Sequence, residues 1–393
     1  MPSLPCTATL PSYDVAARPP LVSHALLVRF VSIVGSSVGF YLPLAVVPLV
    51  AAASGSASSA GLSTVALLVA TVLCELVTPR LVARVGYRWA LGLGLALLGA
   101  PTAVLAWSSV PAVVLAVSVL RGAGFAVTVT AGGAVTAALI PAERRGEGLA
   151  LVGLVGGVPG MLALPAGLWI GARWGYGPVF VTTALVTLLA LVSVPGLPSR
   201  AASADGDRAP SHGGVLAGLR DHAVRRPAVV FASSTAAVGV LVTFLPLAVR
   251  GRHAWVAALA LLAQPAASTA ARWWAGRVGD RRGQAGLLVP GLVLAMAGML
   301  GVALTSTPAA VLGGALVFGA GFGILQNATL SLMYARASGS EDVVSAIWNA
   351  SYDLGMAAGA LVAGLVVAHA GYAAAFVLSA LVMGPAMVLA RRR

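Results

Sequence analysis

Two charged side chains stand inside long apolar runs, where a charge needs a function or a strong partner. Arg121 lies ten residues after Pro111, which places it about 15 Å deep in a helix that spans a membrane. Asp353 lies nine residues into another apolar run. A charge at the bilayer centre costs roughly 2.5–3.5 kcal/mol on insertion scales. We expect both residues to handle substrate or protons; the alternatives are a structural ion pair for Arg121 and hydrogen-bonded packing for Asp353.

Asp353 shares a helix face with Asn349, because the two residues are four positions apart. Burial penalises the charged form of a carboxylate, so a position inside the membrane suits reversible protonation. We therefore expect Asn349 to belong to the same pathway as Asp353.

Four further polar residues are weaker candidates for the pathway: Arg29, Glu75, Gln326 and Asn327. Arg29 and Glu75 lie one or two turns from the end of an apolar run, where a long side chain can instead extend to the membrane surface. A further alternative for Glu75 is an internal ion pair with the arginines around the inner loops. Gln326 and Asn327 line the cavity or, equally, form a hydrogen bond between helices.

The rest of the chain is dominated by apolar residues. Of its 393 residues, 59% are hydrophobic and 9% are charged, against about 25% charged in ordinary soluble proteins. This composition argues against a soluble enzyme or a DNA-binding protein. The net charge of +13 comes from 24 arginines, with no lysine, that fall mostly between the apolar runs. That distribution predicts a membrane topology, and we expect no nucleic-acid partner.

The apolar runs predict twelve transmembrane helices, since a bilayer core of about 30 Å needs roughly 20 apolar residues. The predicted spans are 25–50, 60–79, 89–107, 111–138, 149–171, 177–196, 228–249, 254–275, 286–305, 309–333, 345–368 and 372–390. With the N-terminus inside, nineteen arginines fall on the inner side and three on the outer side. By the positive-inside rule, both termini are expected in the cytoplasm of a multi-pass cell-membrane protein.

This pattern divides the chain into five parts, which are a cytoplasmic tail (1–24), a six-helix bundle (25–196), a cytoplasmic linker (197–226), a second six-helix bundle (227–390) and a short cytoplasmic C-terminus (391–393). The linker is the longest polar stretch and is flexible by composition, with a short surface helix expected around Leu216 to Arg226. We expect the protein to act as a monomer in the lipid bilayer.

The two halves are copies of one another. Tyr41-Leu-Pro-Leu-Ala-Val recurs from Phe244, Gly122-Ala-Gly-Phe recurs from Gly319, and a longer pattern that begins Gly175-Tyr recurs from Gly371. The offsets are 203, 197 and 196 residues. Three ordered matches at a nearly constant offset predict parallel six-helix repeats with a substrate site between them.

With this repeat, the sequence resembles the major facilitator superfamily over nearly its whole length. The family's signature loop, Gly-x-x-x-Asp-Arg-x-Gly, follows the eighth predicted helix as Gly276, Asp280, Arg281 and Gly283. The copy after the second helix keeps only Arg84 and Gly86, with Ala83 in place of the aspartate. In the family this loop is a latch that holds the cytoplasmic side closed, so the resemblance implies a latch at Asp280 and Arg281. The alternative is that the loop's arginines only set topology.

Two other segments also resemble the family. Arg121 followed by Gly122-Ala-Gly-Phe looks like its second motif, whose arginine is linked to proton transfer in proton-coupled exporters. The fifth predicted helix is similar to that of the drug–proton antiporters, although Leu164 replaces the glycine expected before the proline. The residues that match are Gly156, Gly160, Pro165 and Gly167. Close packing through small residues is the alternative.

We therefore expect a secondary transporter of a small organic molecule, driven by the proton gradient, that exports its substrate by alternating access. The alternatives are proton-coupled uptake of a nutrient or metabolite, or a transport-inactive membrane sensor or membrane enzyme. The sequence has no nucleotide-binding loop, no nucleophile motif and no histidine pair with metal spacing, so we expect no enzyme activity, no cofactor and no metal.

Overall fold

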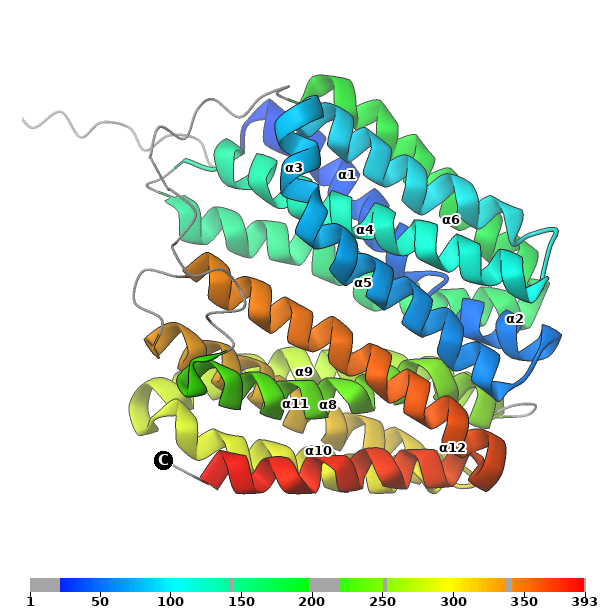
Figure 1. The fold of residues 1–393 in the computed structure, drawn as a ribbon, viewed down its shortest axis with the longest axis vertical. Helices are drawn as coiled ribbons and strands as arrows, with labels where there is room; N and C mark the ends of the chain where they lie inside the picture. The colour runs from blue at the N-terminus through cyan, green and yellow to red at the C-terminus, as the bar shows by residue number, and fades with distance from the viewer. Residues whose placement is uncertain (1–21, 142–143, 198–219, 250–252, 337–340, 392–393) are drawn as a thin grey trace, which may run out of the picture.

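The computed structural model describes residues 22–141, 144–197, 220–249, 253–336 and 341–391, and this part of the chain contains helices and no strand. Figure 1 shows two bundles of long, roughly aligned helices, the N-terminal one above the C-terminal one. The predicted N-terminal tail and most of the linker lie outside the described residues. So do the last two residues of the predicted C-terminus.

The elements follow one another in two sets. The N-terminal bundle holds α1 (His24–Tyr41), α2 (Val46–Ser54), α3 (Ala57–Val104), α4 (Pro111–Leu139), α5 (Arg145–Trp174), α6 (Tyr176–Leu189) and η2 (Ala190–Gly196). The C-terminal bundle holds α8 (His222–Ala248), α9 (Ala254–Arg282), η4 (Gln284–Leu287), α10 (Leu288–Val302), α11 (Pro308–Arg336) and α12 (Glu341–Arg391).

Two of these helices are too long for a single crossing. With 48 and 51 residues, α3 and α12 would each extend about 70 Å, against about 30 Å for the bilayer core. Each one bends at a glycine with positive φ, Gly86 in α3 and Gly371 in α12. The ten apolar helical segments in the described ranges therefore provide twelve crossings, and the predicted all-helical membrane fold is confirmed.

The repeat seen in the sequence is also present in the backbone. Positive φ angles of 81–86° occur in the described residues at Gly86, Gly175, Gly283 and Gly371. Gly86 and Gly283 are 197 residues apart, and Gly175 and Gly371 are 196 apart. Only glycine adopts this conformation without a steric penalty, so the four glycines fix the same sharp turns in both halves.

Several predicted helix boundaries differ from those in the structure. The first apolar run, 25–50, is broken between Tyr41 and Val46, because Pro43 has no N–H for the helix. The second bundle begins at His222 instead of residue 227, because the side chain of Asp221 caps α8 by accepting a hydrogen bond from the Ala223 N–H. The predicted span 345–368 begins earlier, at Glu341.

The two bundles are in close contact at one end of the molecule, which we call the far end; it carries the turns at Gly175 and Gly371. Here α3 meets α12, and the Ser58 hydroxyl donates to the Gly364 carbonyl at 3.3 Å. The hydroxyls of Thr64 in α3 and Thr243 in α8 are 3.0 Å apart. Buried apolar side chains of α5 and α9 also join one core there: Ala163, Leu164, Leu168, Val256, Ala257 and Leu261.

The bundles separate toward the opposite end, which we call the linker end because η2 and the start of α8, which flank the linker, lie there (Figure 1). One face of α12 shows the change: Ala360 is buried, Asp353 is half-buried and Asn349 is exposed. The facing side of α3 changes in the same direction, from buried Gly61 through half-buried Glu75 to exposed Pro79. The seam between α3 and α12 is thus closed at the far end and open at the linker end.

We expect Gly61→Leu to open the far end. A Cβ at Gly61 would overlap the Ala360 carbonyl oxygen, so the larger side chain must push α3 and α12 apart. Spin labels at Ser56 and His369, in a background without the native cysteines, measure the separation as an increase of several ångströms. Gly384→Leu is the control, because no atom lies within 4 Å of its Cβ position. An unchanged distance in Gly61→Leu would contradict this account of the seam.

Candidate functional site

The break after α1 leaves two backbone carbonyls without their helical partners. In a continuous helix the Gly39 carbonyl would accept from residue 43, but Pro43 has no N–H. The Leu44 N–H turns instead to the Tyr41 carbonyl at 3.2 Å, which also leaves the Phe40 carbonyl free. Inside a membrane no water replaces such bonds, so another donor is required.

Arg121 supplies that donor. Its Nη2 lies 3.2 Å from the Phe40 oxygen and 3.4 Å from the Gly39 oxygen. The arginine is 1% exposed and has no ion pair in the described part of the chain, and its Nε has no partner there. A positive charge also suits the C-terminal end of a helix. Arg121 therefore caps broken α1 from within the N-terminal bundle and does not meet Asp353, although both were expected near the pathway.

Arg29 is held in the same way between α1 and α4. Its Nε donates to Thr136 at 3.1 Å and its Nη1 donates to Ser32 at 2.6 Å. Because only 5% of the residue is exposed, the alternative that it extends to the membrane surface is wrong. Neither buried arginine points into the seam between the bundles as a free charge.

The seam instead carries two carboxylates from opposite bundles. Asp353 lies two turns from Ala360 on the same face of α12, and Glu75 lies four turns from Gly61 on the same face of α3, so both stand on the faces that meet at the Gly61–Ala360 contact. Both carboxylates are half-buried, and neither forms an ion pair or a hydrogen bond with another described residue. Glu75 lies about three turns before the bend at Gly86, because α3 continues past the predicted end at residue 79. It is therefore not at a helix end.

Aromatic side chains fix the Asp353 segment against the C-terminal bundle. The Trp348 ring stacks on Phe231 with 4.5 Å between centroids, and the Trp348 Nε1 donates to Thr329 at 3.3 Å. Tyr352 packs against Phe231 and Phe322, at 6.0 and 6.3 Å. Tyr41 and Tyr352 were not among the residues predicted from the sequence, although Tyr41 opens the repeated Tyr41–Val46 segment and Tyr352 adjoins Asp353.

The glycine pattern in α5 makes room for the break in α1. A Cβ at Gly160 would lie 2.7 Å from the Tyr41 ring, and one at Gly167 would overlap the Leu42 carbonyl. Gly156 faces Ile33 of α1 in the same way, at 3.2 Å. These contacts agree with close packing through small residues, and they leave room for the Tyr41 ring against α5. Pro165 lies inside α5 between these contacts.

The remaining polar candidates are divided between the seam and the bundle interior. Asn349 is exposed one turn from Asp353, on the same face of α12. Gln326 accepts a hydrogen bond from the Ser268 hydroxyl at 3.0 Å, which is the helix–helix contact given as its alternative. Asn327 lies against Gly276 of α9, and its Oδ1 is buried without a partner among the described atoms.

The signature loop at the end of α9 is not engaged in this conformation. Asp280 and Arg281 are exposed and form no ion pair or hydrogen bond with another described residue. In the first copy, Arg84 is likewise exposed. For the latch that the resemblance implies, this exposure agrees with bundles that are apart at the linker end.

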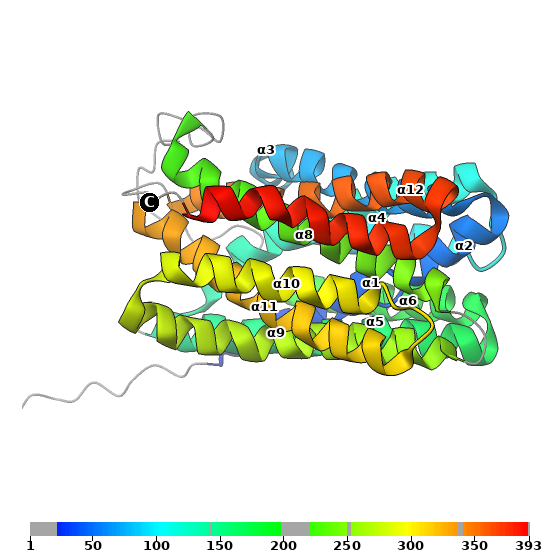
Figure 2. The same cartoon turned by 90° about the horizontal axis from the view of Figure 1, so that it is seen from below.

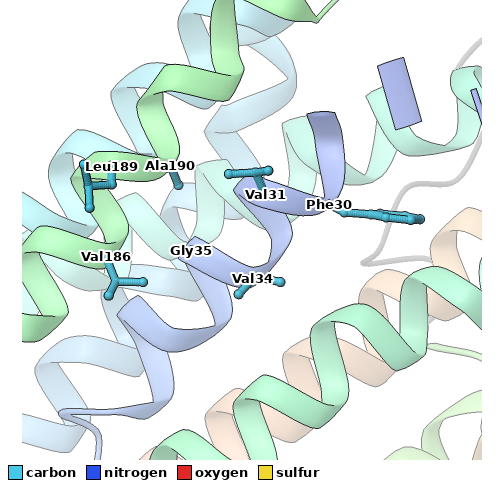
Figure 3. Close-up of a pocket in the computed structure, with 7 residues that line it drawn as sticks. All are labelled: Phe30, Val31, Val34, Gly35, Val186, Leu189 and Ala190. Atoms are coloured by element: carbon cyan, nitrogen blue, oxygen red, sulfur yellow. The ribbon is translucent and has the colours of Figure 1, made fainter. Parts of the chain in front are cut away.

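A groove of about 430 Å³ lies elsewhere, between α1 and the end of α6 (Figure 3). Its lining is apolar, and it contains none of the candidate residues. The residues that line it are Phe30, Val31, Val34, Gly35, Val186, Leu189 and Ala190. A groove without a polar group cannot orient a polar substrate, so the candidate site remains the seam at Asp353.

We expect the stability effects of Arg121 and Pro43 to be coupled. Arg121→Ala leaves two buried carbonyls unsatisfied, at about 1–3 kcal/mol each. Pro43→Ala restores an N–H for the Gly39 carbonyl, so the double variant should lose less stability than the sum of the single variants. Thermal unfolding of the purified variants in detergent measures the stability lost in each single variant and in the double variant. Strictly additive effects would show that Arg121 does not cap the break.

A second expected outcome concerns Asp280 and Ala83 in the two copies of the signature loop. If Asp280 closes the linker end in another conformation, Asp280→Asn should increase the labelling of a cysteine placed at Asn349, and Ala83→Asp should decrease it. The free energy at stake is about 1–3 kcal/mol. Glu147→Gln, which breaks the exposed pair with Arg144, serves as the control. Unchanged labelling in both variants would leave the loop with a topological role only.

Comparison with known proteins agrees with this architecture. The family model of the Major Facilitator Superfamily matches residues 29–345. A chloramphenicol resistance protein of Streptomyces lividans is 30% identical over 264 residues, which cover 64% of this chain and 65% of that protein.

Solved structures share the fold at low identity. The nucleoside transporter NupG has a TM-score of 0.73 at 12% identity, covering 94% of this chain and 99% of NupG. The xylose transporter XylE from E. coli, in a partially occluded inward-open conformation, also has 0.73, at 15% identity and coverages of 93% and 97%. The human organic anion transporter MFSD10 has 0.61 at 20% identity, with coverages of 93% and 98%. The chain belongs to the Major Facilitator Superfamily and is a multi-pass membrane transporter, not an enzyme.

Proposed function

We propose that this transporter exports a small organic molecule in exchange for protons, with Asp353 and Glu75 as the groups that carry the proton. The observation that carries the proposal is the placement of one carboxylate from each bundle at the seam, without an ion-pair partner among the described residues. Two charges in a membrane interior are costly unless they are neutralised by a proton or a bound cation. Tyr41 and Tyr352 complete the surroundings with polar phenol groups.

The coupling follows from electrostatics. When both carboxylates are ionised, their repulsion favours bundles that stay apart at the linker end. A proton bound at the pair removes that repulsion and lets the bundles approach, so protonation shifts the balance between the two access states. Exchange results when substrate and proton occupy the seam alternately. Arg121 acts at a distance, as a positioning residue for Tyr41.

Export is supported by the resistance protein of S. lividans, since removal of a compound from the cell is one route to resistance. Chloramphenicol is therefore the first substrate to test. Uptake is the second candidate, because the structural neighbours NupG and XylE are named as transporters of nucleosides and xylose. In that case Asp353 and Glu75 would carry protons into the cell together with the substrate.

Everted vesicles from cells that produce the full chain distinguish the two directions. For an exporter, chloramphenicol should accumulate inside the vesicles and dissipate a pH gradient that is acidic inside. For an importer, the nucleoside or sugar should accumulate only in right-side-out vesicles with a gradient that drives protons inward. A response to nucleosides or sugars with none to chloramphenicol or related toxic compounds would favour uptake.

Among the variants, we expect Asp353→Asn to lower proton-coupled flux at least tenfold, because the amide cannot bind and release a proton at the seam. Glu75→Gln should lower it less and shift its pH dependence, since it removes the repulsion within the pair. Glu147→Gln is again the control, with the same chemical change at an exposed site. Near-normal flux in Asp353→Asn at normal membrane expression would remove Asp353 from the mechanism.

A further inference from the structure

The exposed face of α9 carries a tryptophan near each end. Trp255 and Trp273 are 18 residues apart, which is five full turns, so both lie on one face of the helix. The rise between them is about 27 Å, close to the thickness of the bilayer core. Their exposed fractions are 54% and 63%. Tryptophan favours the boundary between hydrocarbon and head groups, so Trp273 marks that boundary at the linker end.

One turn beyond Trp273, an arginine lies flat on the indole. The guanidinium carbon of Arg277 is 3.4 Å from the centre of the Trp273 ring. This stacking holds the cation and leaves the N–H groups at its rim free to donate outward. Arg281 follows one turn later and is also exposed. Neither arginine forms an ion pair with a described residue, although Asp280 lies between them in the sequence.

We propose that Arg277 and Arg281 bind the phosphate of an anionic phospholipid, with Trp273 as the platform that orients Arg277. The two guanidinium groups lie just beyond the hydrocarbon boundary, where lipid phosphates are found. Planar guanidinium groups bind phosphate oxygens through paired, charge-assisted hydrogen bonds. Figure 2 shows α9 along the edge of the C-terminal bundle, so a lipid has direct access to it. The depth of Trp273 favours a lipid over a soluble anion.

The internal repeat provides a matched comparison. At an offset of 197 residues, Leu76, Arg80 and Arg84 of α3 correspond to Trp273, Arg277 and Arg281. Leu76, Arg80 and Arg84 are exposed as well, so charge, spacing and exposure are alike. The leucine cannot stack under a guanidinium. A binding site built by Trp273 should therefore exist on α9 and be weaker or absent on α3.

The test measures lipid binding to the purified full-length protein by native mass spectrometry. Phosphatidylglycerol and phosphatidylcholine with the same acyl chains are compared. We expect Arg277→Gln to reduce phosphatidylglycerol binding several-fold and to leave phosphatidylcholine binding unchanged. Arg80→Gln, with the same loss of charge at the same end of the protein, should reduce it much less.

Trp273→Leu separates the built site from charge alone, because it copies the arrangement on α3 and keeps every arginine. It should lower the preference for phosphatidylglycerol, and Arg277→Lys should have an intermediate effect; elution as a single symmetric peak shows that a variant is folded. Equal losses in Arg80→Gln and Arg277→Gln would overturn the proposal in favour of a general attraction. Displacement of the lipid by inorganic phosphate alone would also overturn it, since the site would then recognise a soluble anion.

Discussion

The hydrogen bonds from Arg121 to the carbonyls of Gly39 and Phe40 are the interaction on which the seam depends. A membrane offers no water to a broken helix, so Pro43 can interrupt the first crossing only because Arg121 satisfies the carbonyls that it frees. The break ends α1 at Tyr41, whose ring packs against Phe40 and over Gly160 of α5. A charge that looks functional from its position in the sequence thus has a structural task, and its effect on the seam is indirect.

The C-terminal half solves the same problem without a charge. Phe318 stands at the position of Arg121, and α8 continues through Pro246 to Ala248. The two halves therefore share turns and helix order but differ where chemistry is needed. Apolar aromatic packing in the C-terminal bundle anchors the segment with Asp353, whereas a buried cation in the N-terminal bundle anchors the segment with Tyr41. This asymmetry lets a repeated fold form one site at its centre.

The bundles touch at the far end and are apart at the linker end. Asp353 and Glu75 therefore have no ion-pair partner across the seam among the described residues. Small residues bring α3 and α12 together at Gly61 and Gly364, and this contact leaves the linker end apart. Asp353 and Glu75 lie where buried seam gives way to open seam. In the proposed function, a group at that point is exposed to one side in this conformation and enclosed when the bundles close. That is the geometric requirement for alternating access.

The amino-acid sequence was enough to predict the membrane class, the twelve crossings and the repeat, and it marked Asp353 as a candidate. The lengths of the apolar runs predict the crossings, and the nearly constant offset between matching segments predicts the repeat. Asp353 is conspicuous because it is a charge within an apolar run. The sequence could not decide what Arg121 and Arg29 contact, because the periodicity of a buried helix is too uniform to show which neighbour it faces. Only the tertiary structure paired Arg121 with the carbonyls of α1, joined Gln326 to Ser268 and brought Glu75 to the seam. Those pairings depend on how separate helices pack, and no spacing along one helix encodes them.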